Sequence, residues 1–182
     1  MTRRIPAACV VLALFGAVPA TAQTDQQKPL KGVTAVSVLI ENLNDAAASC
    51  GVTTADLTTA TTKALLDNGL SVNPEVDLAG LGPVTQDLFK SFGVSPAPTL
   101  YVNVNTVYLE SARLCVSDVE VELYERLSAT PRHSEQPVSG TFILADRAAM
   151  NFSGSANHGQ RIRDNVFQLV EEIAVDIRLA NQ

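Results

Sequence analysis

The sequence predicts an α+β two-layer sandwich, in which two main helices pack on one face of a mainly antiparallel sheet of four to five strands. Residues 115–127 alternate apolar and polar side chains with the period of a strand that has one wet face. Residues 54–68 and 159–180 carry apolar side chains at helical spacing. Two amphipathic helices beside a half-polar sheet bury both apolar surfaces and leave the other sheet face open to solvent.

The first half of the domain has two well-marked elements. Residues 33–40 are apolar on both faces, which predicts a strand in the interior of the sheet. The helix over 54–68 begins at a capping box, in which Thr53 and Asp56 satisfy each other's backbone donors. It ends at Asn68 and Gly69, where glycine suits the left-handed position that follows a helix. A short strand is expected over residues 70–76.

Residues 71–98 are rich in proline and glycine and form the least regular stretch. Val84, Leu88, Phe89 and Phe92 are spaced as on a short amphipathic helix. A lid or docking loop is one interpretation of this stretch, because long loops in compact domains are often functional. An irregular connection that packs its phenylalanines on the core is the simpler one.

The second half is rich in strands. Residues 100–105 alternate as a half-buried strand, and the short link at 111–113 predicts a hairpin to the next strand. That strand presents on one face Cys115, Val119, Val121, Leu123 and Leu127, and on the other Asp118, Glu120, Glu122, Tyr124 and Arg126. After a polar loop at 128–137 we expect a long strand over 138–152. The last helix would be capped by Asn157 or Ser155.

The amino terminus has the three parts of a cleavable signal peptide. Arg3 and Arg4 form a positive start, residues 5–18 are apolar, and Ala20-Thr21-Ala22 supplies an A-x-A cleavage signature before Gln23. The apolar stretch is shorter than the roughly 20 helical residues that cross a bilayer. The sequence therefore predicts export, with cleavage near Ala22.

The alternative of a lipoprotein acylated at Cys9 fits less well, because the preceding residues do not match the acylation signal and most of the apolar core follows the cysteine. We expect residues 1–22 to be removed and residues 23–32 to be a flexible mature amino terminus. Residues 33–182 would form a single domain, a size that suits one core.

Charge limits the partners of the mature chain. Removing Arg3 and Arg4 from the 13 basic residues leaves 11 against 19 acidic residues, a net charge of −8. So acidic a surface repels nucleic acid and anionic membranes. No second apolar run reaches membrane length, so a soluble periplasmic or secreted protein is expected.

Two cysteines, Cys50 and Cys115, remain after processing. A lone pair in an oxidising compartment usually forms one disulfide. A redox pair normally has C-x-x-C spacing and a zinc site needs more ligands, so we favour a structural disulfide.

Motifs with chemistry of their own are missing. His133 and His158 are expected in polar loops, far apart in sequence and without metal-ligand spacing. There is no G-x-S-x-G motif, glycine-rich phosphate loop or zinc cluster. We therefore expect no catalytic residue, no metal site, no cofactor and no enzymatic activity.

Two surfaces are candidates for binding. Ser155, Arg161 and Arg163 at the start of the last helix could form an anion site, although arginines paired with neighbours such as Asp164 are the simpler interpretation. The polar face of strand 115–127 could hold calcium, but such a site normally needs a loop around the ion. The candidate interaction surface comprises Asp118, Glu120, Glu122, Tyr124, Arg126, Phe89 and Phe92.

The order of strand 33–40, helix 54–68, hairpin 100–127 and helix 159–180 resembles that of small periplasmic accessory domains. Examples are the lipopolysaccharide-assembly lipoprotein and auxiliary components of envelope transporters. The resemblance implies a non-enzymatic accessory or assembly protein of the bacterial cell envelope, with another envelope protein as its partner. The alternative is a periplasmic protein that binds a small ligand or lipid in a pocket beneath residues 77–98.

Overall fold

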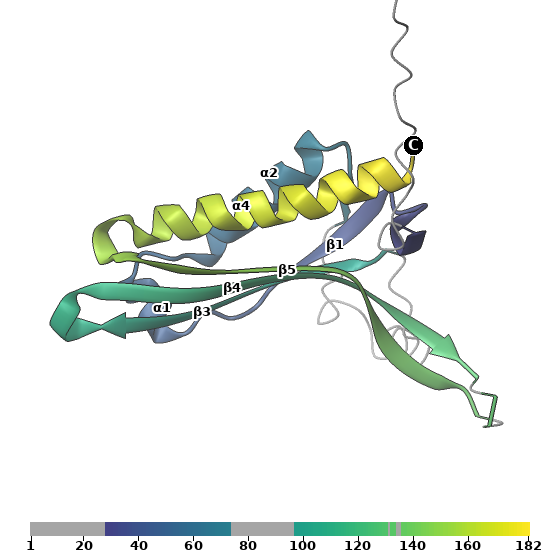
Figure 1. Ribbon diagram of the computed structural model, residues 1–182, viewed down its shortest axis with the longest axis horizontal. Coiled ribbons are helices and arrows are strands. Elements are labelled where there is room, and N and C mark those ends of the chain that lie inside the picture. Colours follow the sequence, from purple (N-terminus) through teal and green to yellow (C-terminus); the bar gives the residue numbers. More distant parts are fainter. Residues whose placement is uncertain (1–27, 74–96, 131, 134–135) are drawn as a thin grey trace, which may run out of the picture.

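The computed structural model describes residues 28–73, 97–130, 132–133 and 136–182 (Figure 1). The predicted signal peptide, the predicted short helix with Phe89 and Phe92, and most of the segment expected to cover a ligand pocket lie outside the described residues.

The sheet has five strands in the order β2-β1-β3-β4-β5. Its strands are β1 (Ala35–Ile40), β2 (Ser71–Asn73), β3 (Thr99–Leu109), β4 (Leu114–Ala129) and β5 (Val138–Gly154). The long pairings, β3 with β4 and β4 with β5, are antiparallel. β1 is interior, as predicted, but it runs parallel to both of its neighbours, so the sheet is mixed.

Within the described residues the helices are η1 (Lys28–Leu30), α1 (Asp45–Ser49), α2 (Thr54–Asp67), η3 (Glu110–Ala112) and α4 (Ser155–Ala180). α2 and α4 lie side by side over one face of the sheet (Figure 1). The predicted two-layer α+β fold is therefore confirmed. α2 and α4 correspond to the two predicted helices, whereas the short helix α1 was not predicted.

α1 forms because Asn44 caps it and ties it to the sheet. The side-chain oxygen of Asn44 accepts a hydrogen bond from the Ala47 backbone at 3.0 Å, and its nitrogen donates to the Thr106 carbonyl at 2.9 Å. A five-residue helix is too short to show an apolar period, which is why the pattern of the sequence did not reveal it.

The ends of α2 follow the expected capping chemistry. Thr53 accepts a hydrogen bond from the Asp56 backbone, and its hydroxyl donates to the Asp56 carboxylate at 2.7 Å. At the other end Gly69 has φ +78°, and the Leu70 backbone donates to the Leu65 carbonyl. This is the Schellman arrangement, which closes the last turn of the helix.

The core lies between the helices and the odd-numbered face of β4. Cys115, Val119, Val121 and Leu123 are fully buried, as the alternation of the sequence predicts. They meet the apolar stripe of α4, whose buried aliphatic members are Ile162, Val166, Leu169, Val170, Ile173 and Ile177. The strand register proposed from the sequence is thus confirmed over 115–123.

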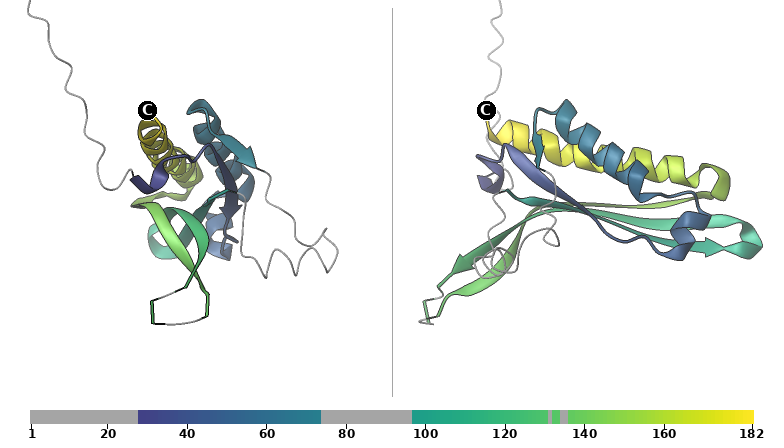
Figure 2. Two further views of the ribbon diagram at one scale, coloured as in Figure 1. Left: turned by 90° about the vertical axis from the view of Figure 1, so that its right-hand side faces the viewer. Right: turned by 180° about the vertical axis from the view of Figure 1, so that it is seen from behind.

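Beyond Leu123 the β4–β5 hairpin leaves the helices behind. A β-bulge between Leu123 and Tyr124 shifts the register, and the two strands continue as an arm that projects past the helix layer (Figure 2). Leu127 was grouped with the apolar face, but it is 41% exposed because no helix covers the arm. A bulge bends its strand and increases the local twist, which accounts for the change of direction.

Two predicted boundaries change. Leu30 is buried in the core and the Gly32 backbone donates to Asn181 at 2.7 Å, so the packed part of the domain begins before residue 33. α4 begins at Ser155, with Gly154 as its N-cap and no side-chain cap. The cap predicted at Asn157 or Ser155 is therefore wrong.

Candidate interaction surface

The sheet face opposite the helices carries the acidic row predicted from the sequence. Asp118, Glu120 and Glu122 alternate along β4 with buried Val119 and Val121, so their side chains point away from the core. Asp118 is exposed, while Glu120 and Glu122 are half-buried between neighbouring strands.

The register of β3 and β5 extends this row sideways. Tyr101 on β3 and Asp146 on β5 lie directly opposite Glu122 on its two sides. Tyr101 also donates a hydrogen bond to Glu41, which follows β1. We call Glu41, Glu120, Glu122 and Asp146 the acidic cluster.

The cluster shifts the proton affinity of its members. Partial burial, together with the charges of Glu120 and Asp146, raises the pKa of Glu122. The hydrogen bond to Glu41, aided by burial, raises the pKa of Tyr101 to about 12. Both shifts have the direction expected where negative charge gathers without compensation.

Like charges directly opposite each other across two strands weaken a sheet. Among the ion pairs of the described residues, none involves Glu120, Glu122 or Asp146. The arrangement of Glu122 and Asp146 is therefore unfavourable for the fold itself.

Toward the β3–β4 turn the same face becomes apolar. Val107, Val116 and Phe152 lie side by side on the three strands, and Met150 lies next to them opposite Asp118. Met150 and Phe152 are 71% and 69% exposed. Sequence reasoning did not combine these residues, because it gave no pairing register for β5. One signal was available: the alternation of β3 between its two faces continues past residue 105 and places Val107 on the open face.

The two remaining described residues of the predicted surface lie on the arm. After the bulge Tyr124 is opposite Ile143, and Arg126 is opposite Thr141. The structure thus keeps Asp118, Glu120 and Glu122 together on the body of the sheet.

The predicted anion site is not assembled as a separate pocket of positive charge. Arg163 lies 4.0 Å from Asp56 and 3.9 Å from Asp164, and it donates a hydrogen bond to Gln160. These contacts match the simpler interpretation, in which the arginine pairs with acidic neighbours. Ser155 is the first residue of α4, and Arg161 is exposed further along it.

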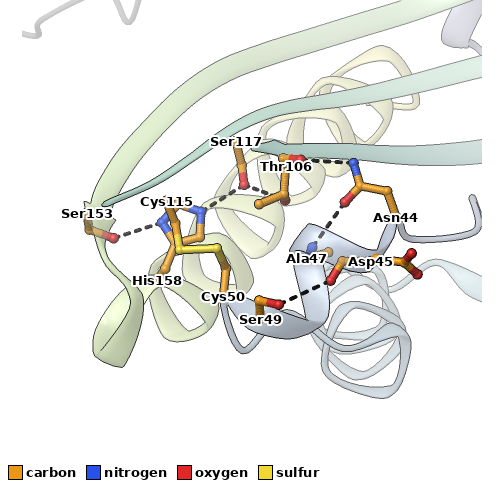
Figure 3. Close-up of a disulfide and its surroundings, with 10 residues drawn as sticks. All are labelled: Asn44, Asp45, Ala47, Ser49, Cys50, Thr106, Cys115, Ser117, Ser153 and His158. Atoms are coloured by element: carbon orange, nitrogen blue, oxygen red, sulfur yellow. Dashed lines mark hydrogen bonds between the residues drawn. A yellow bond between two sulfur atoms is a disulfide. The ribbon is translucent and has the colours of Figure 1, made fainter. Parts of the chain in front are cut away.

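The prediction for His158 is wrong. His158 is fully buried in the first turns of α4 rather than solvated in a loop. Its Nε2 atom lies 2.8 Å from the Ser117 hydroxyl, and its Nδ1 atom lies 2.8 Å from the Ser153 hydroxyl (Figure 3). Ser117 in turn contacts the Thr106 hydroxyl at 2.7 Å.

This buried chain of hydroxyls joins β3, β4, β5 and α4. Burial, with a smaller effect of the nearby Arg161 charge, lowers the pKa of His158. Both ring nitrogens already have partners, so the histidine acts as a polar link inside the core. His133, by contrast, lies in an exposed turn, as predicted.

The predicted disulfide lies beside this network. Cys50 and Cys115 are bonded, with their Cα atoms 6.0 Å apart and both residues fully buried (Figure 3). The bond joins the end of α1 to the start of β4. The disulfide and the histidine network together fix the α1 end and the α4 start to one end of the sheet.

Among the described residues no cluster of three or more histidine, cysteine or acidic side chains has the geometry of a metal site. None of the helices in the described part of the chain has the length and apolar character to cross a membrane.

Comparison with known proteins gives a structural likeness at low sequence identity. No protein-family model matches the chain, and no curated protein matches it. Among solved structures, the chain is similar to a PelC dodecamer from Paraburkholderia phytofirmans, at 12% identity and a TM-score of 0.39. The match covers 80% of this chain and 89% of that chain.

Proposed function

We propose that this chain is an exported, non-enzymatic accessory or assembly protein of the bacterial cell envelope, which binds another envelope protein through its open sheet face. The observation that carries the proposal is the composition of that face. An acidic cluster that weakens the fold lies beside exposed Met150 and Phe152, on a sheet face that neither α2 nor α4 covers.

Export is supported by two independent features. Residues 1–22 have the positive, apolar and small-residue parts of a signal peptide. The buried Cys50–Cys115 bond suits an oxidising compartment, because cytosolic thiols are kept reduced. Amino-terminal sequencing of protein from the envelope fraction tests this part, and we expect Gln23 as the first residue.

The charge of the face specifies the chemistry of the partner. Glu120, Glu122 and Asp146 would be neutralised by lysine or arginine side chains of a bound protein. The neighbouring apolar residues would supply the dry contact that interfaces have at their centre. The expected partner is therefore a protein surface with basic residues next to apolar ones.

In-cell photo-crosslinking tests the proposed surface. A photoreactive amino acid replaces Glu120 on the open face, and a matched variant carries it at Thr59, which is exposed on α2. We expect a discrete adduct with a second envelope protein from position 120 and none from position 59. The absence of any adduct at position 120, in cells that make the protein at normal levels, would contradict the proposal.

A further inference from the structure

The sheet has one long edge and one short edge. β5 is the last strand in the order β2-β1-β3-β4-β5, and its 17 residues pair with β4 alone among the described strands. β2, the strand at the opposite end of that order, has three residues. A sheet edge presents unpaired backbone groups, and natural proteins usually shorten, charge or cover such an edge.

The central part of β5, residues 145–153, lacks these protective features. It contains no proline, and its only charged residues are Asp146 and Arg147. Arg147 is occupied within the chain, because it pairs with Asp176 and lies 3.4 Å from Glu172 on α4.

We propose that a second copy of this chain pairs its β5 antiparallel with this β5 along residues 145–153, which joins two five-stranded sheets into one. This contact uses the edge of the sheet rather than its open face, so it goes beyond the proposed function. The three-residue β2 is too short to match this edge. In a second copy, β5 is the described edge strand that is long enough to pair along this edge.

The charges of β5 select a register. When the same strand of two copies pairs antiparallel, the residue at the centre lies opposite the same residue of the other copy. A charged residue at the centre would therefore face its own like charge, which is destabilising. A pairing centred on Asp146 or on Arg147 is therefore unfavourable. A pairing centred on Ala149 places Asp146 opposite Phe152 and Arg147 opposite Asn151 of the second copy.

The helix beside β5 is complementary in the same register. Asn165 of α4 contacts Asn151 at 2.9 Å, and Asp176 contacts Arg147, so this helix face runs along β5. Arg161 lies on the same helical stripe, four residues before Asn165. When two such helices run antiparallel across the joined strands, the Arg161 end of one faces the Asp176 end of the other. Asn165 of one helix then faces Asp176 of the other, and Arg161 lies one turn beyond Asn165.

Disulfide trapping tests the pairing. We compare Ala149→Cys with Ala112→Cys, a control in the exposed η3 turn, in protein purified from cells that express the full chain. On air oxidation we expect on the order of ten times more covalent dimer from A149C than from A112C, because only residues at the pairing centre fall within disulfide reach. Equal yields from the two variants would overturn the proposal.

Sedimentation equilibrium supplies a measurement that needs no added cysteine. We expect the unmodified protein to be a dimer and Ala148→Lys to be a folded monomer with an unchanged circular dichroism spectrum, since residue 148 is exposed and lysine is a natural edge blocker. A monomeric unmodified protein at its highest attainable concentration would overturn the proposal. The crosslinking result at Glu120 stays interpretable in that case, because adducts with another protein and with a second copy differ in mass.

Discussion

Gly159 of α4 lies directly against the backbone of Gly51, beside the buried disulfide. A methyl group added at position 159 would lie 2.0 Å from the Gly51 carbonyl oxygen, closer than real Cβ contacts allow. Gly51 itself has φ +73°, a conformation that favours glycine. These two glycines let the start of α4 approach the turn that carries Cys50.

Gly159→Ala should destabilise the protein, because backbone atoms on both sides must move apart to admit the methyl group. We expect a loss of about 1–3 kcal/mol in the free energy of unfolding, the usual cost of overpacking. Urea titration measures this loss. Gly154→Ala is the matched control, since a methyl group there meets nothing within 4 Å, and an equal loss in both variants would contradict the close contact.

The disulfide should contribute a large part of the stability. Cys50 and Cys115 are 65 residues apart, and closing a loop of that length in the unfolded chain is worth about 4 kcal/mol. We expect the double variant C50A/C115A to lose stability of this order in chemical denaturation. A loss below about 1 kcal/mol would show that the bond adds little beyond the packing around it.

The register of β4 predicts opposite tolerance at neighbouring positions. Leu123→Asp places a charge in the fully buried core, where an unpaired carboxylate is strongly unfavourable, and should abolish folding. Glu122→Asp, on the open face, should leave the melting temperature nearly unchanged. Thermal melts followed by circular dichroism compare the two, and similar melting curves would refute the register.

His158 should make the protein less stable in mild acid. Its pKa is lowered in the folded state, so the unfolded chain binds the proton more readily. The stability present above the unfolded pKa of about 6.5 is therefore lost as the pH falls from that value through the lower pKa of the folded state. We expect His158→Gln to remove part of this dependence between neutral and mildly acidic pH.

The exposed His133 provides the control for that titration. His133→Gln makes the same substitution in an exposed turn, so it separates the effect of losing the buried imidazole from that of replacing a histidine. Equal pH profiles for all three proteins would mean that His158 titrates normally.

Much of the fold could be predicted because local pattern and tertiary environment agree. The capping box at Thr53 and the glycine at position 69 fix α2 through bonds within one or two turns. The alternation of β4 reports burial directly, since each odd residue from 115 to 123 faces the helix layer. Cys50 and Cys115 could be paired because no other cysteine follows the predicted signal peptide.

Two of the misses involve polar residues whose partners are distant in sequence. His158 looks like a loop residue, because its neighbours are Asn157 and Gly159, but its hydrogen-bond partner Ser117 comes from β4, 41 residues earlier. The acidic cluster was predicted only in part for the same reason. Asp146 lies opposite Glu122 through the strand register, and Glu41 is hydrogen-bonded to Tyr101 on the strand at the other side of Glu122. No spacing along the chain encodes either contact.

Under the proposed function, the acidic cluster is kept for binding at the expense of the fold. The triple variant E120Q/E122Q/D146N removes the like charges and keeps the shape of the side chains. We expect its melting temperature to rise slightly, because repulsion across β4 and β5 is lost. The decisive measurement is the yield of the envelope-protein adduct from a photoreactive residue at Asp118 in this background. We expect the yield to fall sharply while the protein becomes no less stable; an undiminished yield would contradict the proposed binding role of the cluster.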